Sequence, residues 1–426
     1  MAKHFFNLGL SCVVIAVILF FKSIAATGDE KLLFQVMVIV SGITGAVVII
    51  FRRKLTWKTF CFSMIASMFA VVIVEMGLTM GLELVHRMVP STIDKSMRLT
   101  PFRDQPWAAE FFRESLDLEL GYTRSVGFIT KPVSGLYLNI DSMGQRKTWN
   151  PAESDMDTLI IFGGSTIFGI GARDEYTIPS FLSKKLSAAK HPLYTINVGQ
   201  SGRNTLQEIN HLVWLLQNGL RPKYVVFYDG ANDLNHSYVF HKTANEGFVP
   251  QMDEFLKLQK SGLSDQLIFA FKNGMLHSKV FKAIKRLFPP EPAYLSRPQV
   301  DVNFVSNRIR FKYLTIKNIL DDMSRRYNFR LHCFWQPMVY TKKNLTEEEI
   351  ESDGRAPESD FKELVIQTNN LLMNDTAYNF SNISNVFDSV DHTIFIDYCH
   401  ISEEGNEIVA QKMFEILSTR FFKSKE

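Results

Sequence analysis

The stretch TLIIFGGSTIFG, from Thr158 to Gly169, decides how this chain is expected to fold. A short, continuous apolar run that ends in two glycines is typical of a strand buried on both faces and followed by a tight turn. Three later runs have the same character and predict further buried strands: YTINVG at 194–199, YVVFYDG at 224–230 and LHCFWQP at 331–337. A fifth candidate strand is NVFDSV at Asn385–Val390.

Helical patterns separate these strands. The apolar spacing predicts helices over about Ile178–Lys190, Leu206–Asn218, Asn307–Tyr327, Phe361–Met373 and Glu403–Phe422. Strands that alternate with helices in this way favour a parallel sheet with helices on both faces. The sequence therefore predicts an α/β domain over residues 158–426, built as a three-layer α/β/α sandwich around a central parallel sheet.

Four short polar motifs lie at the ends of these elements. GGST (163–166), GRN (202–204) and GAND (230–233) follow the first three strands, and DYCH (397–400) precedes the last predicted helix. Ligands of open α/β sheets bind at the carboxyl ends of the strands. The first three motifs are therefore expected to meet at one site.

These motifs supply the groups that acyl transfer through a serine requires. Ser165 is the candidate nucleophile, His400 its base, and Asp397 the acid that orients the imidazole. The Asn232 amide and the Gly202 and Ser165 backbone N–H groups are candidate donors to an oxyanion. Each motif alone is consistent with an ordinary turn or helix cap, so the prediction depends on their joint occurrence. The phosphate-loop motif GxxxxGK[ST] and the GxSxG elbow are absent.

The order of these motifs resembles the SGNH hydrolase superfamily, also called GDSL esterases and lipases. The four matching blocks are FGGSTIFG, NVGQSGRNT, FYDGANDL and DYCHISEEGN. The resemblance implies a flavodoxin-like SGNH fold and a cofactor-free esterase with Ser165 as nucleophile, His400 as base and Asp397 as its orienter. It also implies that Gly202 and Asn232 complete the oxyanion hole with Ser165. Where the family usually has an aspartate before the serine, this chain has Gly164.

Three apolar stretches precede this domain, at about residues 5–21, 32–51 and 60–82. A helix needs about 20 apolar residues to cross a bilayer, so the second and third are predicted spans. The first is either a short anchor or a cleaved signal peptide. The basic loop RRKLTWK (52–58) is expected in the cytoplasm, which puts everything after residue 82 outside. We thus expect an integral membrane protein with a membrane region at 1–82, a connecting region at 83–157 and an extracytoplasmic catalytic domain.

Composition excludes several other classes. The net charge of +3 is small for 426 residues, so nothing suggests a nucleic-acid surface. The four cysteines form no CxxC motif and HExxH is absent, so no zinc site is expected. In an oxidising compartment Cys333 and Cys399 are either a disulfide or two free buried thiols. An insertion at about 235–300 is a substrate lid, a basic amphipathic helix on the membrane surface, or a helical subdomain.

Three functions fit these observations. The leading one is a membrane-anchored serine esterase that removes an acyl group, such as O-acetyl, from an extracytoplasmic glycan or lipid. The second is an O-acyltransferase that uses the same serine to modify an exported polysaccharide and takes its acyl group from a membrane partner. The third is a non-catalytic glycan-binding or scaffold domain. The expected partners are an acyl ester and the lipid bilayer, with no metal or organic cofactor.

Overall fold

The computed structural model describes residues 97–239 except 124, 300–353, 360–375 and 377–422, together with isolated positions elsewhere. The chain divides into two compact units, Met1–Pro90 with Phe248–Gln299 and Ser91–Gly247 with Val300–Glu426. Every catalytic residue predicted from the sequence belongs to the second unit. Within the described ranges, no helix combines the length and the apolar character needed to cross a membrane. The predicted spans at 5–21, 32–51 and 60–82, and almost all of the 235–300 insertion, lie outside the described residues.

The second unit is built on a five-stranded parallel sheet. Its strands are β5 (Thr158–Gly163), β6 (Tyr194–Asn197), β7 (Tyr224–Asp229), β8 (Arg330–Trp335) and β9 (Phe380–Asn382). The spatial order is β6-β5-β7-β8-β9, with every neighbouring pair parallel. This is the flavodoxin-like order 2-1-3-4-5, in which ligands bind where the strand order reverses, between the first and third strands. The predicted α/β class and the parallel sheet are confirmed.

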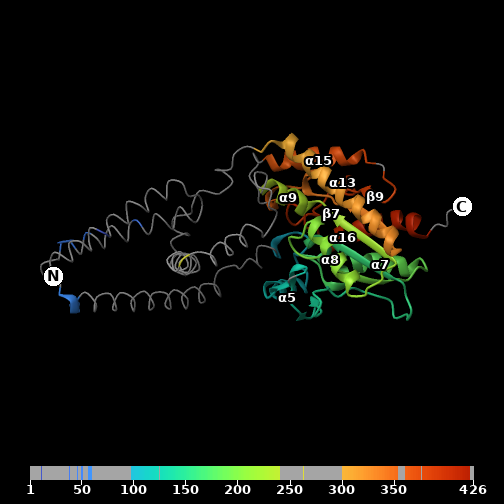
Figure 1. Ribbon diagram of the computed structural model, residues 1–426, viewed down its shortest axis with the longest axis horizontal. Helices are drawn as coiled ribbons and strands as arrows, with labels where there is room; N and C mark the ends of the chain where they lie inside the picture. The colour runs from blue at the N-terminus through green and yellow to red at the C-terminus, as the bar shows by residue number, and fades with distance from the viewer. Residues whose placement is uncertain are drawn as a thin grey trace. The chain divides into compact units, whose positions relative to one another are not determined.

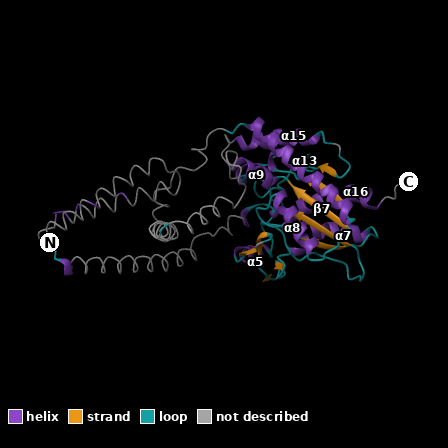
Figure 2. Ribbon diagram, viewed as in Figure 1, coloured by secondary structure: helices purple, strands orange, loops and turns teal. Residues whose placement is uncertain are grey.

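Helices cover both faces of the sheet (Figures 1 and 2). One face packs against α7 (Ile178–Ala188) and α16 (Glu403–Leu417). The other packs against α8 (Thr205–Gln217), α9 (Ala231–Val239), α13 (Val302–Tyr327) and α15 (Asp360–Met373). Each face therefore has its own apolar core, as a three-layer sandwich requires.

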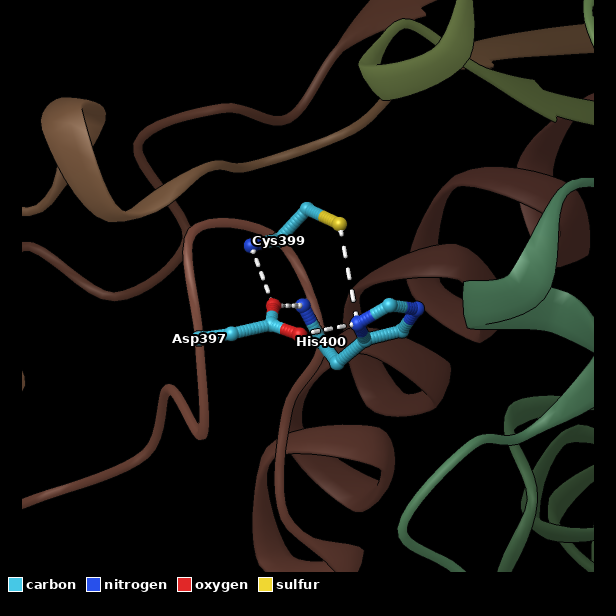
Figure 3. Close-up of side chains that lie close together, drawn as sticks. All are labelled: Asp397, Cys399 and His400. Atoms are coloured by element: carbon cyan, nitrogen blue, oxygen red, sulfur yellow. Dashed lines mark hydrogen bonds and ion pairs between the residues drawn. The ribbon is translucent and has the colours of Figure 1, made fainter. Parts of the chain in front are cut away.

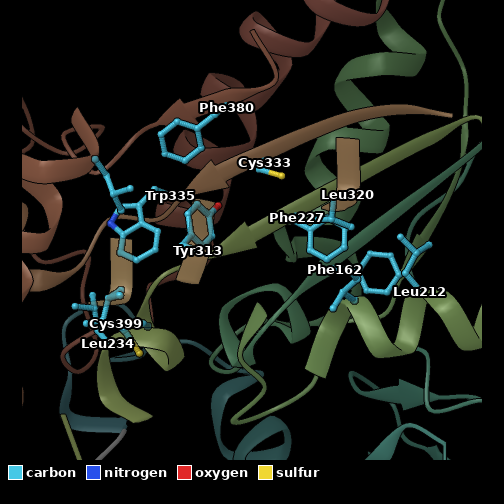
Figure 4. Packing of buried hydrophobic residues seen from close by; sticks show 14 of the residues in the cluster. Phe162, Leu212, Phe227, Leu234, Tyr313, Leu320, Cys333, Trp335, Phe380 and Cys399 are labelled. Atoms are coloured by element: carbon cyan, nitrogen blue, oxygen red, sulfur yellow. The ribbon is translucent and has the colours of Figure 1, made fainter. Parts of the chain in front are cut away.

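Aromatic side chains from adjacent strands make up much of the second core (Figure 4). Phe162 of β5 stacks on Phe227 of β7 with ring centroids 4.8 Å apart. Trp335 of β8 meets Tyr313 of α13 edge-on at 5.0 Å. These rings fill the layer directly beneath the carboxyl ends of the strands, so the loops that follow β5 and β7 start from a rigid base.

The segment between residues 97 and 157 packs onto the same unit. It contains α5 (Ala108–Leu116) and two small antiparallel pairs: β1 (Leu120–Thr123) with β2 (Gly127–Thr130), and β3 (Val133–Ser134) with β4 (Asn139–Ile140). A third apolar cluster joins Phe102, Trp107 and Phe111 of this segment to Phe168, which follows β5. The predicted connecting region thus supplies part of the wall behind the serine loop.

The prediction of a strand at Asn385–Val390 is wrong. This segment forms consecutive turns, in which the N–H groups of Val386, Asp388 and Val390 each donate to the carbonyl three residues earlier. Its Phe387 is fully buried as a core anchor, which explains the apolar pattern without a strand. The fifth strand lies just upstream, at Phe380–Asn382, and pairs with Cys333–Trp335.

Two helix boundaries also differ from the sequence pattern. α13 begins at Val302 instead of Asn307, because the Asp301 side chain accepts the Phe304 N–H and caps the helix. The last helix ends at Leu417 and continues as a π-helical turn, Ser418–Phe422. The remaining short elements are α6 (Ser165–Phe168), α14 (Glu347–Ser352) and 3₁₀ turns at Asp174–Tyr176 and Val339–Thr341.

Candidate active site

Ser165 lies where β5 turns into the short helix α6. The preceding residue, Gly164, has no room for a side chain, because an added Cβ would lie 2.2 Å from Nδ2 of Asn232. Asn232 belongs to the first turn of α9, which follows β7. The serine and the asparagine are therefore brought together at the point where the strand order reverses, between β5 and β7.

His400 connects the serine to an acid. Its Nε2 lies 2.7 Å from the Ser165 Oγ, although the two residues are 235 positions apart in the chain. Its Nδ1 lies 2.5 Å from the Asp397 Oδ2. The side chains are largely shielded, with Ser165 8% and the His400 side chain 13% exposed. A hydroxyl, an imidazole and a carboxylate in this sequence are the arrangement by which a serine is activated as a nucleophile.

The DYCH loop fixes its own carboxylate (Figure 3). The Asp397 Oδ1 accepts the backbone N–H groups of Cys399 at 2.9 Å and His400 at 2.7 Å. These bonds form a local turn of the kind that aspartate side chains favour, and they leave Oδ2 to face the imidazole. The spacing of Asp and His within one loop thus determines the orientation of the base.

Electrostatics favour a positive charge on His400. Burial by itself lowers the His400 pKa, but Cys399 and Asp397 outweigh it and hold the pKa well above its ordinary value of 6.5. Burial raises the Asp397 pKa, but the hydrogen bonds from His400 and the backbone lower it overall. An imidazolium next to an ionised carboxylate is the state that forms when the histidine takes the serine proton.

The oxyanion donors predicted from sequence lie on neighbouring loops. The Asn232 Nδ2 donates to the Arg203 carbonyl at 2.7 Å, which holds the amide against Gly164 and next to Ser165. Gly202 precedes Arg203 and has a φ of +75°, a conformation that glycine adopts without strain. The space around a Cβ at Gly202 is open, so the backbone there is accessible to a ligand. Gly202 therefore lies one residue before Arg203, whose carbonyl holds the Asn232 amide.

Two buried charges that the sequence analysis did not single out hold the serine loop. The Arg146 guanidinium donates to the carbonyls of Phe168, Gly169 and Ala172 at 3.0, 2.9 and 2.7 Å. It also pairs with Asp174 at 3.0 Å. Burial lowers the Arg146 pKa despite this partner. Because three turn carbonyls converge on one side chain, Arg146 sets the path of the chain after α6.

A second ion pair joins the serine loop to the histidine loop. Arg173 binds both carboxylate oxygens of Glu403, at 2.9 and 2.7 Å, and Glu403 is three residues after His400. The guanidinium lies over the rings of Trp107 and Tyr176, with its carbon 4.3 and 3.9 Å from their centroids. Bidentate pairing and ring stacking together restrict the guanidinium to one plane.

A third set of contacts fixes the segment that leads into the DYCH loop. The Glu349 carboxylate accepts the N–H groups of Ile394 and Phe395 at 3.0 and 3.1 Å. It also pairs with Lys342 at 2.7 Å, and both side chains are fully buried. No local pattern marks these charges as functional, because each partner lies far away in sequence or on another loop. The signal that could have found these residues is an Arg or Glu at a position where the surrounding pattern predicts burial.

Buried acids lie behind Asn232. Asp233 accepts the N–H and the hydroxyl of Thr205 at 3.2 and 2.9 Å and so ties the start of α9 to the start of α8. Burial raises the Asp233 pKa to about 6. Burial likewise raises the pKa values of Glu208 and Asp229 well above their ordinary range. Asn204 of the GRN motif caps α8 together with Gln207, which makes its role structural.

The cysteines are not joined. Cys333 and Cys399 are both free and buried, so of the two alternatives left open by the sequence, the structure has thiols. Both pack into the same apolar cluster (Figure 4). Burial, with Asp229 nearby, raises the Cys333 pKa well above its ordinary value. Among the described residues, the side chains that could together hold a metal ion are those of Asp397, Cys399 and His400.

Comparison with known proteins gives likenesses of structure only. No family model and no curated protein matches the chain. Similar solved structures include the acetyl xylan esterase AlAXEase, at 12% identity and a TM-score of 0.33, covering 61% of this chain and 98% of that one. A lipase/acylhydrolase from Enterococcus faecalis has 14% identity and a TM-score of 0.33, covering 64% and 100%. A member of the lipolytic protein G-D-S-L family from Veillonella parvula has 11% identity and a TM-score of 0.32, covering 61% and 98%.

Proposed function

We propose that this chain is a serine esterase of the SGNH type that acts through an acyl-enzyme. The observation that carries the proposal is the relay in which the Ser165 Oγ lies 2.7 Å from His400 Nε2 and Asp397 Oδ2 lies 2.5 Å from His400 Nδ1. The first separation is within the range that proton transfer from nucleophile to base requires, and the second is a short hydrogen bond that orients the base.

The reaction follows from this geometry. Ser165 Oγ attacks the ester carbonyl while its proton passes to His400 Nε2, and Asp397 stabilises the imidazolium. The negative charge on the carbonyl oxygen meets the Ser165 N–H, the Gly202 N–H and the Asn232 amide. The imidazolium then gives its proton to the leaving alcohol, which leaves an acyl group on Ser165. Water attacks this ester with His400 again as base and regenerates the serine.

The proposed substrate is an O-acyl ester, such as an O-acetyl group, on a glycan or lipid outside the cytoplasm. Support comes from the apolar stretches at 5–21, 32–51 and 60–82, which we propose anchor the chain with the catalytic unit on the outer side. An O-acyltransferase would share every step up to the acyl-enzyme and differ in its acceptor, a sugar hydroxyl in place of water.

The chemical step is tested with the full-length chain. We expect hydrolysis of p-nitrophenyl acetate and covalent labelling of Ser165 by a fluorophosphonate, identified by peptide mass spectrometry. Ser165→Ala should abolish both, while Ser142→Ala, a change at an exposed turn, should leave both intact. Labelling of a different residue, or equal activity in both variants, would refute the proposal. Adding an acceptor oligosaccharide and measuring free acetate against acetylated sugar then distinguishes esterase from transferase.

The orientation is tested separately. A membrane-impermeant maleimide should label Ser142→Cys in intact cells and Thr56→Cys only after permeabilisation, both in a background without the native cysteines. Thr56 and Ser142 are exposed positions, one in the basic loop and one in the catalytic unit. The opposite pattern would place the site in the cytoplasm and exclude an extracytoplasmic substrate.

A further inference from the structure

We propose that the DYCH loop is also an inhibitory site for a thiophilic divalent cation such as Zn²⁺, held by Asp397, Cys399 and His400. The inference rests on the proposed function, because inhibition requires His400 to be the base. The proposed site includes the imidazole nitrogen Nδ1, which faces away from the serine. The three ligands lie within the four-residue segment 397–400 (Figure 3).

The ligand atoms are already close to the distances that a metal requires. Oxygen, sulfur and nitrogen of the three side chains all lie within 4.8 Å of one another. The Cys399 Sγ is 3.8 Å from the His400 Nδ1. A tetrahedral zinc, with bonds of about 2.3 Å to sulfur and about 2.0 Å to nitrogen, separates those two atoms by about 3.5 Å. Sulfur and nitrogen therefore need almost no movement.

The carboxylate has to move only slightly. The Asp397 Oδ2 lies 2.5 Å from Nδ1, at hydrogen-bond distance. A zinc ion between the same atoms would separate them by about 3.4 Å. The added separation is about 0.9 Å, and because the carboxylate turns as a rigid plane, the contacts of Oδ1 to the N–H groups of Cys399 and His400 must lengthen with it. The Asp397 side chain is 33% exposed, which gives a cation a path from solvent.

The donor set identifies the class of cation. One thiolate, one imidazole and one carboxylate suit zinc and similar borderline or soft ions, whereas magnesium and calcium prefer oxygen ligands alone. Three protein ligands leave a fourth position for water. The sequence pattern predicted no zinc site, because D-x-C-H is not one of the spacings that mark one. The site becomes visible only when the turn brings the three side chains to one point.

Occupancy of this site would stop catalysis through the tautomer of His400. The free enzyme needs a proton on Nδ1 and a lone pair on Nε2 that can accept the serine proton. When the cation binds Nδ1, the proton from that atom moves to Nε2 through solvent, and the Cys399 thiol releases its proton to solvent. Starting from the neutral imidazole of the active enzyme, the net change is one bound cation and one released proton. Nε2 is then a donor and cannot take the proton of Ser165.

Metal binding is tested on the full-length chain without reference to activity. Co²⁺ is titrated into the protein, and thiolate-to-cobalt charge-transfer absorption is recorded. We expect a band at one equivalent that Zn²⁺ displaces, that Ser165→Ala retains and that Cys399→Ser loses. Cys333→Ser is the matched control, a second buried free thiol away from the imidazole, and should keep the band. Absence of the band, or its retention in Cys399→Ser, would overturn the proposal.

Inhibition is measured in parallel. Zn²⁺ should lower the esterase rate at least tenfold in the wild type and in Cys333→Ser, and EDTA should restore it. In Cys399→Ser the half-inhibitory concentration should rise at least tenfold, with the variant's own metal-free rate as reference. Equal sensitivity with and without Cys399 would overturn the proposal. A Cys399-dependent band in a protein with no Ser165-dependent activity would support the cation site and refute the esterase, so the two failures are distinguishable.

Discussion

Gly164 offers the sharpest test of the oxyanion site, because it is where this chain departs from the family it resembles. An added Cβ at Gly164 would lie 2.2 Å from the Asn232 Nδ2, and real Cβ atoms essentially never come closer than 3.0 Å to another heavy atom. In Gly164→Ala the amide must therefore move away by about 0.8 Å.

A displacement of this size should be expensive for the chemical step. Misplacing a catalytic group by about 1 Å can cost about a hundredfold in rate. Loss of one oxyanion donor typically costs about 10²–10³ in kcat, or about 2.7–4 kcal/mol. We therefore expect Gly164→Ala to lower kcat by about 10²–10³ with little change in KM. Gly121→Ala is the control, because a Cβ there meets its nearest neighbour at an ordinary 3.5 Å.

A double-mutant cycle on p-nitrophenyl acetate hydrolysis identifies the cause. If Gly164→Ala acts by moving the Asn232 amide, the double variant Gly164→Ala/Asn232→Ala should be no slower than Asn232→Ala alone. Multiplied losses would mean that the methyl group damages something else in the serine loop. Unchanged kcat in Gly164→Ala would refute the reasoning outright, since it would show that the amide is not needed where the structure places it.

Three further predictions concern the surrounding charges. The rate should rise with pH as His400 loses its proton, with a midpoint above pH 6.5. Asp397→Asn, assayed with EDTA, should move that midpoint to lower pH and lower kcat by up to about 10⁴-fold. An unmoved midpoint would exclude His400 as the titrating base. Arg173→Lys and Glu403→Gln should each lower kcat clearly and change the melting temperature little. Exchanging the two charges should recover part of the lost kcat, which an effect confined to one of the two residues would not allow. Between pH 3.8 and about 6, Asp233 of the folded protein keeps a proton that the unfolded chain has released. The free energy of unfolding should therefore fall by about 3 kcal/mol as the pH rises through this range. Denaturant titrations of Asp233→Asn should show a weaker dependence of this free energy on pH.

The local features of the site could be predicted from sequence, and its long-range supports could not. Ser165 and Asn232 stand at the ends of apolar runs, and chain continuity with a parallel sheet is enough to bring such positions together. Asp397 and His400 share one loop, so their mutual geometry is also local. That the loop reaches Ser165 depends on the packing of α16, which no pattern near residue 400 encodes.

The errors have the same origin. Asn385–Val390 shows the apolar content of a strand, yet Phe387 is buried from a series of turns, because tertiary packing and not period determines its position. The true edge strand, Phe380–Asn382, is three residues long and contains one large apolar side chain, so it carries almost no periodic signal. A short edge strand can be identified only from the strand with which it pairs, and that pairing is known only from the fold.

Glu349 shows how a buried charge can serve geometry at the expense of stability. Replacing a buried ion pair by apolar residues is often neutral or stabilising, so Lys342 and Glu349 are not explained by stability alone. Glu349 also accepts two backbone N–H groups of the segment that leads to Asp397, a task that an apolar residue cannot perform. Glu349→Gln should therefore leave Lys342 as an unpaired buried charge and destabilise the fold by about 3–5 kcal/mol.

Adding Lys342→Met removes that charge, while a glutamine oxygen in the position of Oε1 still accepts the N–H groups of Ile394 and Phe395. We expect Lys342→Met/Glu349→Gln to recover most of the stability, measured by denaturant unfolding. Activity should then depend on the backbone contacts that remain: kcat should stay near the wild-type value in this double variant and fall at least tenfold in Lys342→Met/Glu349→Leu, where no acceptor is left. Equal kcat in the two double variants would show that the contacts to Ile394 and Phe395 do not position the base, and that this ion pair has no part in catalysis.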